Sequence, residues 1–155
     1  NKETAEKASG IDLSSFAVTD LNGNAVSQDI FKDYDVTMIN VWATWCNPCR
    51  RELPDIQAAY EKLPANANII SICADAGQET ELAGQIVEKV GLQYEVLVPD
   101  DAMDELLNEY ISAFPTTFLV DKEGNVIGQP IIGVPQADDV TQYYLDYIES
   151  GLENN

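Results

Sequence analysis

Two cysteines separated by two residues are the part of this sequence best suited to chemistry. Cys46-Asn47-Pro48-Cys49 follows an apolar strand pattern and opens a helical one. Residues three apart in the first turn of a helix lie on the same side, so the two sulfurs can form a disulfide without straining the main chain. The unpaired N–H groups and positive dipole of a helix start favour an anion, which lowers the pKa of Cys46 below the roughly 8.5 of a free thiol. The spacing predicts a reversible dithiol in which Cys46 reacts first and the shielded Cys49 second.

Two other uses of such a pair, a zinc site and a structural disulfide, fit the sequence less well. A zinc site needs two further ligands, whereas the chain has no histidine and its one other cysteine is Cys73. A structural disulfide across so short a loop gains little stability, and a strand-to-helix turn flanked by aromatic residues is an unusual place for one. Both remain minor alternatives, and we expect no metal and no other cofactor.

A buried strand and a helix must position this pair, and the surrounding pattern predicts both. Residues 36–42 form a nearly continuous apolar run, as in a strand buried on both faces. A helix follows over about 47–63, and Pro54 inside it should kink it. Upstream, Asn-Gly at 22–23 lies between two short apolar segments and predicts a β-hairpin before the main sheet.

The remaining chain alternates strands with helices, which indicates an α/β fold. Residues 68–74 are predicted as a second buried strand, and the helix after it ends at Gly91, so a βαβ unit is expected. The later elements are a strand over 94–98, a short helix over 103–110, two strands joined by a tight turn at 122–124, and a helix over 140–148. We expect a polar tether over 1–12, one domain over 13–150 and a short tail over 151–155.

The net charge is the outlying property of the composition. The 155 residues are 45% hydrophobic and 23% charged, with a formal net charge of −19 at pH 7. Nucleic acid and anionic membrane surfaces would be repelled, so neither is an expected partner. A solvated acidic surface explains the charge, with attraction to a basic partner face as the alternative. The sequence contains no run of 18 apolar residues, so a membrane anchor would be a signal or lipid segment not present in this chain.

Two segments together carry a resemblance to a known family. They are Trp42–Pro54, with the sequence WATWCNPCRRELP, and Phe114–Asp121, with the sequence FPTTFLVD, which Gly124 follows. Over about residues 15–148 the chain resembles the TlpA/ResA-like thiol-disulfide oxidoreductases, a branch of the thioredoxin superfamily. The resemblance implies a thioredoxin-like fold over 13–150, with a central mixed sheet flanked by helices, an N-terminal β-hairpin and a strand-helix insertion. It also implies an exported protein, often membrane-anchored.

The resemblance assigns roles to individual residues. Cys46 matches the attacking cysteine and Cys49 the resolving one. Pro115 matches a proline held in cis opposite the dithiol, where it leaves nearby backbone free to pair with substrate; an ordinary proline at a strand start is the alternative. Glu52 matches an acidic residue that could relay the proton of Cys49 if burial raises its pKa, unless it is a solvated helix residue. The expected substrate contacts are Trp45, Pro48, Phe114 and Thr116.

Several neighbours of the dithiol have simpler interpretations. Trp42 either helps Trp45 to shape an apolar collar around the sulfurs or belongs to the core. Arg50 and Arg51 favour the Cys46 thiolate weakly at most, and a place on the helix surface is the preferred interpretation. Cys73 lies within a strand pattern, where a buried cysteine behaves as a small, inert hydrophobic residue.

These observations predict an enzyme that exchanges disulfides with other proteins. The Cys46 thiolate attacks a partner disulfide, and Cys49 then resolves the mixed disulfide. The resemblance favours reduction of disulfides in exported proteins, among them apocytochromes during cytochrome c maturation. It names a membrane thiol-electron transporter as the reductant, and we expect a monomer.

Three other functions are alternatives to this one. A peroxiredoxin-like thiol peroxidase needs a Pro-X-X-X-Thr-X-X-Cys loop, but Thr44 stands two residues before Cys46 instead of three, and the proline is missing. A copper chaperone of the Sco type needs a histidine, which the chain does not have. A non-catalytic thioredoxin-fold binding module stays open, and it would keep its role without Cys46.

Overall fold

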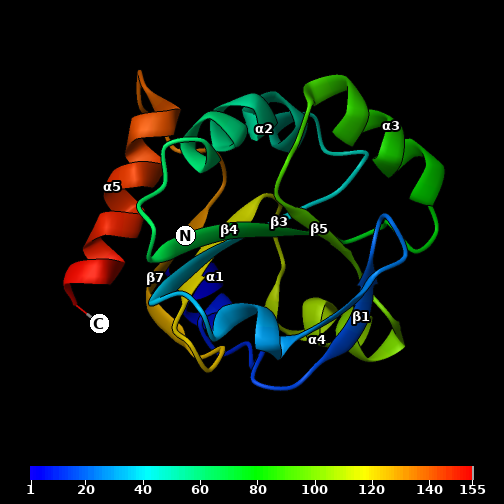
Figure 1. Cartoon of the computed structure of the whole chain (residues 1–155), viewed down its shortest axis with the longest axis horizontal. Helices are drawn as coiled ribbons and strands as arrows, with labels where there is room; N and C mark the ends of the chain where they lie inside the picture. Colours follow the sequence, from blue (N-terminus) through cyan, green and yellow to red (C-terminus); the bar gives the residue numbers. More distant parts are fainter. Residues whose placement is uncertain (155) are drawn as a thin grey trace.

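A seven-stranded mixed sheet forms the centre of the computed structural model, which describes residues 1–154 (Figure 1). In chain order the elements are α1 (Lys2–Ala8), β1 (Ala17–Asp20), β2 (Ala25–Ser27), the 3₁₀ helix η1 (Gln28–Phe31), β3 (Val36–Trp42), α2 (Asn47–Tyr60), β4 (Ala67–Cys73), α3 (Thr80–Val90), β5 (Glu95–Val98), α4 (Asp101–Tyr110), β6 (Thr116–Val120), β7 (Val126–Ile132) and α5 (Val140–Glu153). The expected α/β fold is confirmed, and from β1 onward the strands and α-helices follow the expected order.

The strand order places β3 and β4 in the middle of the sheet. The order is β2-β1-β5-β4-β3-β6-β7. The pairs β3–β4 and β4–β5 are parallel, and the other four pairs are antiparallel. The predicted βαβ connection is therefore present, and the N-terminal hairpin is the far edge of the same sheet. Every residue of β3 is buried, which explains its continuous apolar pattern.

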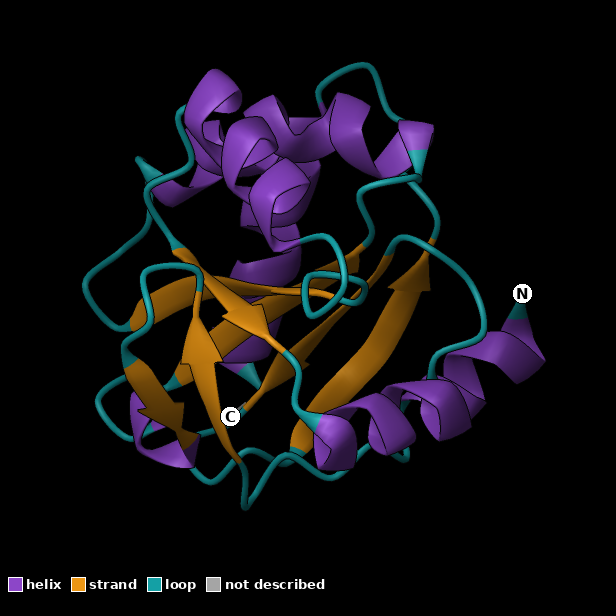
Figure 2. Ribbon diagram, turned by 90° about the vertical axis from the view of Figure 1, so that its right-hand side faces the viewer, coloured by secondary structure: helices purple, strands orange, loops and turns teal. Residues whose placement is uncertain are grey.

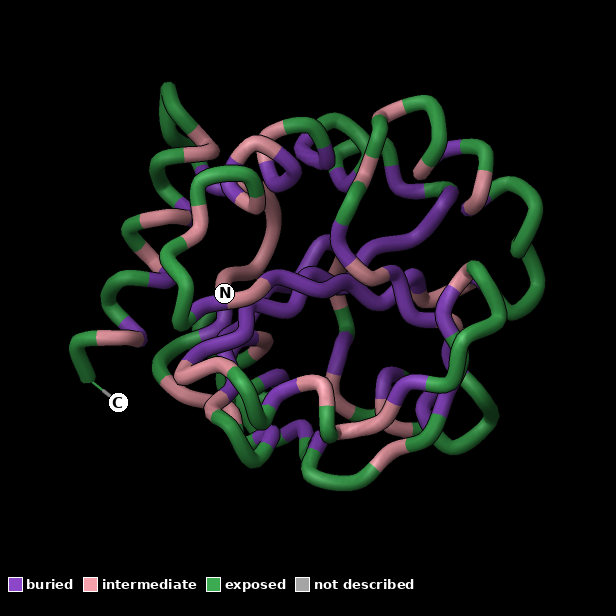
Figure 3. The backbone as a smooth tube through the Cα atoms, viewed as in Figure 1, coloured by how far each residue is buried: buried purple, intermediate pink, exposed green. Residues whose placement is uncertain are grey.

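Helices cover both faces of the sheet, and β3 contributes to the core on each face (Figures 1 and 2). Ile39 and Val41 point into a cluster that also holds residues of α1 and α4. Val36 and Met38 pack against α2 and α5 on the opposite face. The buried part of the chain follows the strands, whereas the helices keep their outer sides exposed (Figure 3). The dithiol thus follows a strand that is buried along its whole length.

The two ends of the chain are more ordered than the sequence indicates. Residues 1–12 were expected to be a polar tether, but they contain α1, which begins where the Asn1 side chain accepts a hydrogen bond from the Thr4 N–H at 2.9 Å. Ala5 and Ala8 of this helix are buried. Two small alanines in a polar segment produce no visible apolar period, which is why the helix was missed. At the other end, Gly151 was assigned to the tail but is a buried residue of α5.

Within residues 1–154, no helix combines the length and the apolar character that a membrane crossing requires.

Gly124 should be much less tolerant of a side chain than a second glycine with the same backbone conformation. Its φ is 84°, and an added Cβ would lie 2.5 Å from the carbonyl oxygen of Leu13. Gly23 has a φ of 83°, with nothing within 4 Å of the same position. We expect Gly23→Ala to lower the free energy of unfolding by about 1 kcal/mol and Gly124→Ala by about 3 kcal/mol, because a clash is added to the backbone strain. Urea denaturation measures both, and equal losses would contradict the close approach.

Candidate active site

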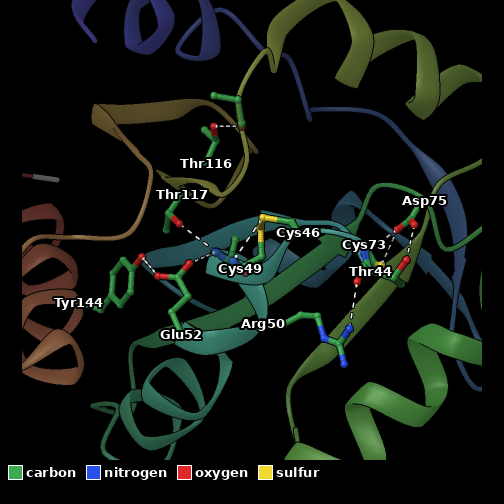
Figure 4. The surroundings of a disulfide bond; sticks show 12 residues. Thr44, Cys46, Cys49, Arg50, Glu52, Cys73, Asp75, Thr116, Thr117 and Tyr144 are labelled. Carbon is green, nitrogen blue, oxygen red and sulfur yellow. Dashed lines mark hydrogen bonds between the residues drawn. A yellow bond between two sulfur atoms is a disulfide. The ribbon is translucent and has the colours of Figure 1, made fainter.

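The dithiol lies where the end of β3 turns into α2 (Figure 4). Cys46 is the N-cap of α2, and Pro48 occupies its first turn, where a missing N–H leaves no helical bond unmade. Cys46 and Cys49 form a disulfide with their Cα atoms 5.3 Å apart, within the usual range of about 4.4 to 6.8 Å. The exposed fraction is 4% for Cys46 and 0% for Cys49. The predicted pair therefore exists, with the outer sulfur on Cys46.

The start of α2 favours negative charge on Cys46. The backbone N–H of Cys49 points at the Cys46 sulfur, with a nitrogen-to-sulfur distance of 3.3 Å. In the reduced protein the same N–H and the helix dipole stabilise a Cys46 thiolate over the thiol. Cys49 lies inside the first turn of α2. Within residues 1–154 no hydrogen-bond donor points at its sulfur, and burial disfavours its charged form. A base is needed to bring Cys49 into reaction.

Glu52 supplies a carboxyl group on the inner side of the same helix, one turn after Cys49. Its side chain is 1% exposed, so the alternative of a solvated helix glutamate is wrong. The Tyr144 hydroxyl donates to Oε1 at 2.6 Å, and the Asn40 amide donates to Oε2 at 3.2 Å. Burial raises the pKa of Glu52 to about 7, although both hydrogen bonds favour the charged form. A carboxyl group with this pKa can take up and release a proton near neutral pH.

Two residues that hold Glu52, Asn40 and Tyr144, were missed in the sequence. Asn40 also donates to the Thr117 hydroxyl at 3.0 Å, so one amide joins β3, β6 and α2. Tyr144 is fully buried on α5, and Figure 4 shows its hydroxyl turned toward the Glu52 carboxylate. Asn40 was the available signal, because a buried amide interrupts an apolar strand and must find partners. Nothing in the sequence separated Tyr144 from the other apolar positions of its helix.

The loop before β6 places Phe114 and Pro115 beside the dithiol segment. The peptide bond between Phe114 and Pro115 is cis, as the resemblance implies. Trp45 is 66% exposed and meets the edge of Phe114 with ring centres 5.6 Å apart. Pro48, Phe114 and Pro115 line a hollow of about 500 Å³ that Glu52 also reaches. Thr116 differs: it is buried, and its hydroxyl donates back to the Ala113 carbonyl at 2.7 Å.

The third cysteine belongs to a separate hydrogen-bonded group at the end of β4. Cys73 is fully buried, and its thiol donates to Asp75 at 3.5 Å. Burial, with the nearby charge of Asp75, raises the pKa of the Cys73 thiol above its ordinary range. Thr44 donates to the same carboxylate through its hydroxyl and, at 2.9 Å, its N–H. Cys73 thus has the inert surroundings expected of a core cysteine.

Trp42 and Arg50 do not present their polar groups to the sulfurs. Trp42 is fully buried and donates to the Ser71 hydroxyl at 3.2 Å. It is a core residue, in the same apolar cluster as Cys46 and Cys49. Arg50 reaches toward the Thr44 carbonyl at 3.5 Å, away from the disulfide (Figure 4).

Several known proteins have sequences similar to this one. The family model described as AhpC/TSA family matches residues 10–129. The thiol-disulfide oxidoreductase ResA of Bacillus thuringiensis strain Al Hakam is 34% identical over 137 residues, which cover 86% of this chain and 75% of that protein. The ResA of Geobacillus kaustophilus is 30% identical over 142 residues, which cover 91% of this chain and 79% of the relative.

Solved structures agree with the sequence relatives. A thiol:disulfide interchange protein of the thioredoxin family from Chlorobium tepidum superposes with a TM-score of 0.68 at 25% identity. The match covers 86% of this chain and 95% of that one. The seven-stranded sheet with flanking helices is therefore a thioredoxin-like fold.

Proposed function

The chain belongs to the AhpC/TSA family and is a ResA-like thiol-disulfide oxidoreductase, and from this premise we propose that Cys46 and Cys49 are its catalytic dithiol, served by Glu52. The observation that carries the proposal is the buried Glu52 carboxyl, one helical turn from a cysteine pair that closes into a disulfide. The fold supplies an anion-favouring helix start for the first sulfur and a proton acceptor near the second.

The first step uses the outer sulfur. The Cys46 thiolate attacks one sulfur of a partner disulfide, the partner's sulfur–sulfur bond breaks, and the released partner sulfur takes up a proton. A mixed disulfide between Cys46 and the partner results. Trp45, Pro48, Phe114 and Pro115 surround the approach to Cys46 and provide an apolar surface for the partner segment. Thr116 takes part through its backbone at most, because its hydroxyl is bonded to the Ala113 carbonyl.

The second step uses the inner sulfur and Glu52. Cys49 gives its proton to the Glu52 carboxylate and attacks the Cys46 sulfur, which forms the Cys46–Cys49 disulfide and releases the partner as a dithiol. Two electrons pass from the protein to its partner. Tyr144 and Asn40 hold the carboxylate in place through its two oxygens. A pKa of about 7 keeps part of the Glu52 population ionised at neutral pH and ready to accept that proton.

The proposed setting is the cell envelope. The partners are disulfide-containing exported proteins, including apocytochromes during cytochrome c maturation, and a membrane thiol-electron transporter returns the electrons. Anchoring would come from a signal or lipid segment that this chain does not include. The protein works as a monomer. Support for this setting comes from the kinship with ResA-type oxidoreductases.

A redox titration tests the reducing direction. We expect the Cys46–Cys49 couple to have a potential nearer to the about −270 mV of thioredoxin than to the about −120 mV of a strong oxidant. Equilibration with dithiothreitol buffers, followed by alkylation and mass measurement, gives the value. A potential near or above about −120 mV would reverse the proposed direction and leave the exchange chemistry in place.

A peroxidase function is less well supported by the site. In the peroxide-cleaving loop a threonine holds the substrate beside the reactive cysteine, but both the hydroxyl and the N–H of Thr44 are bonded to Asp75. Thr44, the threonine nearest to Cys46 in the sequence, therefore points its hydroxyl at Asp75 and not at a substrate.

A further inference from the structure

A hollow on the outer side of the dithiol helix concentrates positive charge in an acidic protein. It has a volume of about 590 Å³ and lies between α2 and α3, which are side by side on one face of the sheet (Figure 1). Its lining residues are Asn47, Arg50, Arg51, Pro54, Ile86, Lys89 and Val90. We call it the α2/α3 hollow. Three of the eight lysines and arginines of the chain are gathered here, although the net charge is −19.

These cations are available to a ligand. Among the residues that line the hollow within the described chain there is no aspartate or glutamate, despite 27 acidic residues in the sequence. Over residues 1–154 the single ion pair joins Lys122 to Asp35, with a nitrogen-to-oxygen distance of 3.3 Å. Arg51 and Lys89 are exposed. Within residues 1–154 the guanidinium of Arg50 donates one hydrogen bond, to the Thr44 carbonyl at 3.5 Å. Within the described residues the hollow therefore presents three cations that form no ion pair.

The α2/α3 hollow lies along the first turns of the dithiol helix and shares Arg51 with the hollow beside Pro48. Asn47 and Arg50 lie within four residues of Cys46 in the first turns of α2. Arg51 lines both the α2/α3 hollow and the second hollow, which contains Pro48, Phe114 and Pro115. The lining positions of α2 span about 10 Å along the helix axis, the length of about three residues of extended chain. A peptide joined to Cys46 can thus reach the cations with residues two to four positions from its own cysteine.

We propose that the α2/α3 hollow docks an acidic segment of the partner protein, next to the partner cysteine that exchanges with Cys46. This inference rests on the proposed function and adds a partner chemistry to it. Aspartate or glutamate side chains of the segment meet Arg50, Arg51 and Lys89, while its aliphatic parts cover Pro54, Ile86 and Val90. Charge-assisted hydrogen bonds of this kind are stronger than neutral ones and fix orientation.

The net charge of the protein restricts the partner to a short acidic segment. A nucleic acid or an anionic membrane presents many negative charges to the whole surface and is repelled. A few carboxylates inside the hollow lie close to the cations, while the remaining acidic surface is screened over about 8 Å at physiological salt. The fitting partner therefore carries two or three acidic residues near its cysteine on an otherwise neutral or basic protein.

Three matched peptides test this directly. Each contains one cysteine in a mixed disulfide with a neutral small thiol, and they differ only in carrying glutamate, glutamine or lysine at the second to fourth positions after it. Reduced protein should react with the glutamate peptide about tenfold faster than with the glutamine peptide at low salt, because several exposed charge pairs each contribute modestly. The ratio should fall toward one in about 0.5 M salt.

Variants locate the effect. Lys89→Glu changes a side chain on α3, outside the helix of the dithiol, and should reduce the glutamate preference at least fivefold. Lys62→Glu is the matched control, since this lysine is exposed and does not line the hollow, and it should keep the preference. Circular dichroism melting verifies that both variants fold. An equal rate for the glutamate and glutamine peptides, a preference for lysine, or a preference untouched by Lys89→Glu would overturn the proposal.

Binding without chemistry separates this proposal from the proposed function. The same peptides with serine in place of cysteine cannot exchange, and their affinity is measured by fluorescence anisotropy of a labelled peptide. If the glutamate peptide binds more tightly than the glutamine peptide, and Lys89→Glu abolishes this difference, docking is supported. This holds even if no exchange is observed, and then only the proposed chemistry fails. Sedimentation tests whether the protein forms a dimer at high concentration. A dimer that dissociates in the Lys89→Glu variant would assign the hollow to a second copy of this chain and overturn docking of a partner segment.

Discussion

Replacement of Cys49 by serine should convert a transient exchange into a stable covalent complex. Cys46 keeps its position at the start of α2 and can still attack a partner disulfide, but no second thiol is placed to attack the Cys46 sulfur. The mixed disulfide therefore accumulates. Cells that express Cys49→Ser should yield disulfide-linked partners on non-reducing gels, whereas the wild type yields almost none. Recovery of no linked partner from cells where the variant is abundant would count against the exchange mechanism.

Two further variants assign the trapped bond to the correct sulfur. Cys46→Ser should lose disulfide exchange by at least about a thousandfold, because the nucleophile is removed, and it should trap nothing. Cys73→Ala combined with Cys49→Ser should still trap partners, since the Cys73 thiol is fully buried. Trapping that disappears only in the Cys73 variant would instead assign the reactive sulfur to β4.

Glu52→Gln should slow the resolving step and change its dependence on pH. Positioned acid–base groups typically contribute about a hundredfold or more to proton-transfer steps. In the wild type the release of the partner should accelerate as pH rises through about 7, where Glu52 loses its proton. The variant should show a slower step without this inflection. Stopped-flow measurement of partner release between pH 5 and 9 follows both quantities, and an inflection near 7 that persists in Glu52→Gln would assign the proton transfer elsewhere.

The same substitution, although it slows the reaction, should make the protein more stable at pH 8. Burial raises the pKa of Glu52 in the folded protein from 4.5 to about 7, so the folded state binds this proton more tightly than the unfolded state does. The protonated Glu52 carboxyl therefore contributes about 3 kcal/mol to the free energy of unfolding. This contribution is fully present below about pH 4 and is lost as pH rises toward 7. Glutamine stays neutral, and the Tyr144 hydroxyl can turn to accept from its amide.

Urea denaturation of the oxidised proteins measures this linkage. Glu52→Gln should therefore lose less stability than the wild type between pH 5 and pH 8, and it should be the more stable protein at pH 8. Glu61→Gln is the matched control, because Glu61 is an exposed carboxylate at the end of the same helix. A Glu52→Gln protein with an unchanged pH slope would contradict the raised pKa.

The parts of the site that lie close together in the sequence were predictable. A continuous apolar strand, a cysteine pair and a helix start follow one another within 36–50, and each has its own local signal. The resemblance added a role for Glu52, three residues after Cys49, and for Pro115, which is distant from the cysteines in the sequence. Pairs separated by long stretches of chain were not predictable in this way. Tyr144 meets Glu52 across 92 residues, and no local pattern connects a helix near the end of the chain with the dithiol.

Weak local signals also explain the errors at the ends of the chain. The helix α1 buries only small side chains, so it lacks the large apolar residues from which helical periodicity is read. A Cβ added at Gly151 would lie 2.7 Å from Leu119 Cδ1 and 3.4 Å from Val36 Cγ2, a close approach that only a packed α5 reveals. Thr116 fits the family motif, but the direction of its hydroxyl depends on the loop before it.

The burial of Cys73 has a consequence for how the protein withstands an oxidising environment. With three cysteines in the chain, three different disulfides are conceivable, and two of them would disable the enzyme. Cys73 has no exposed surface and a pKa above the ordinary thiol range, so oxidants and partner disulfides cannot reach a thiolate there. Disulfide scrambling would first require the sheet to unfold. Burial of Cys73 thus keeps the Cys46–Cys49 pair as the disulfide that forms during the redox cycle.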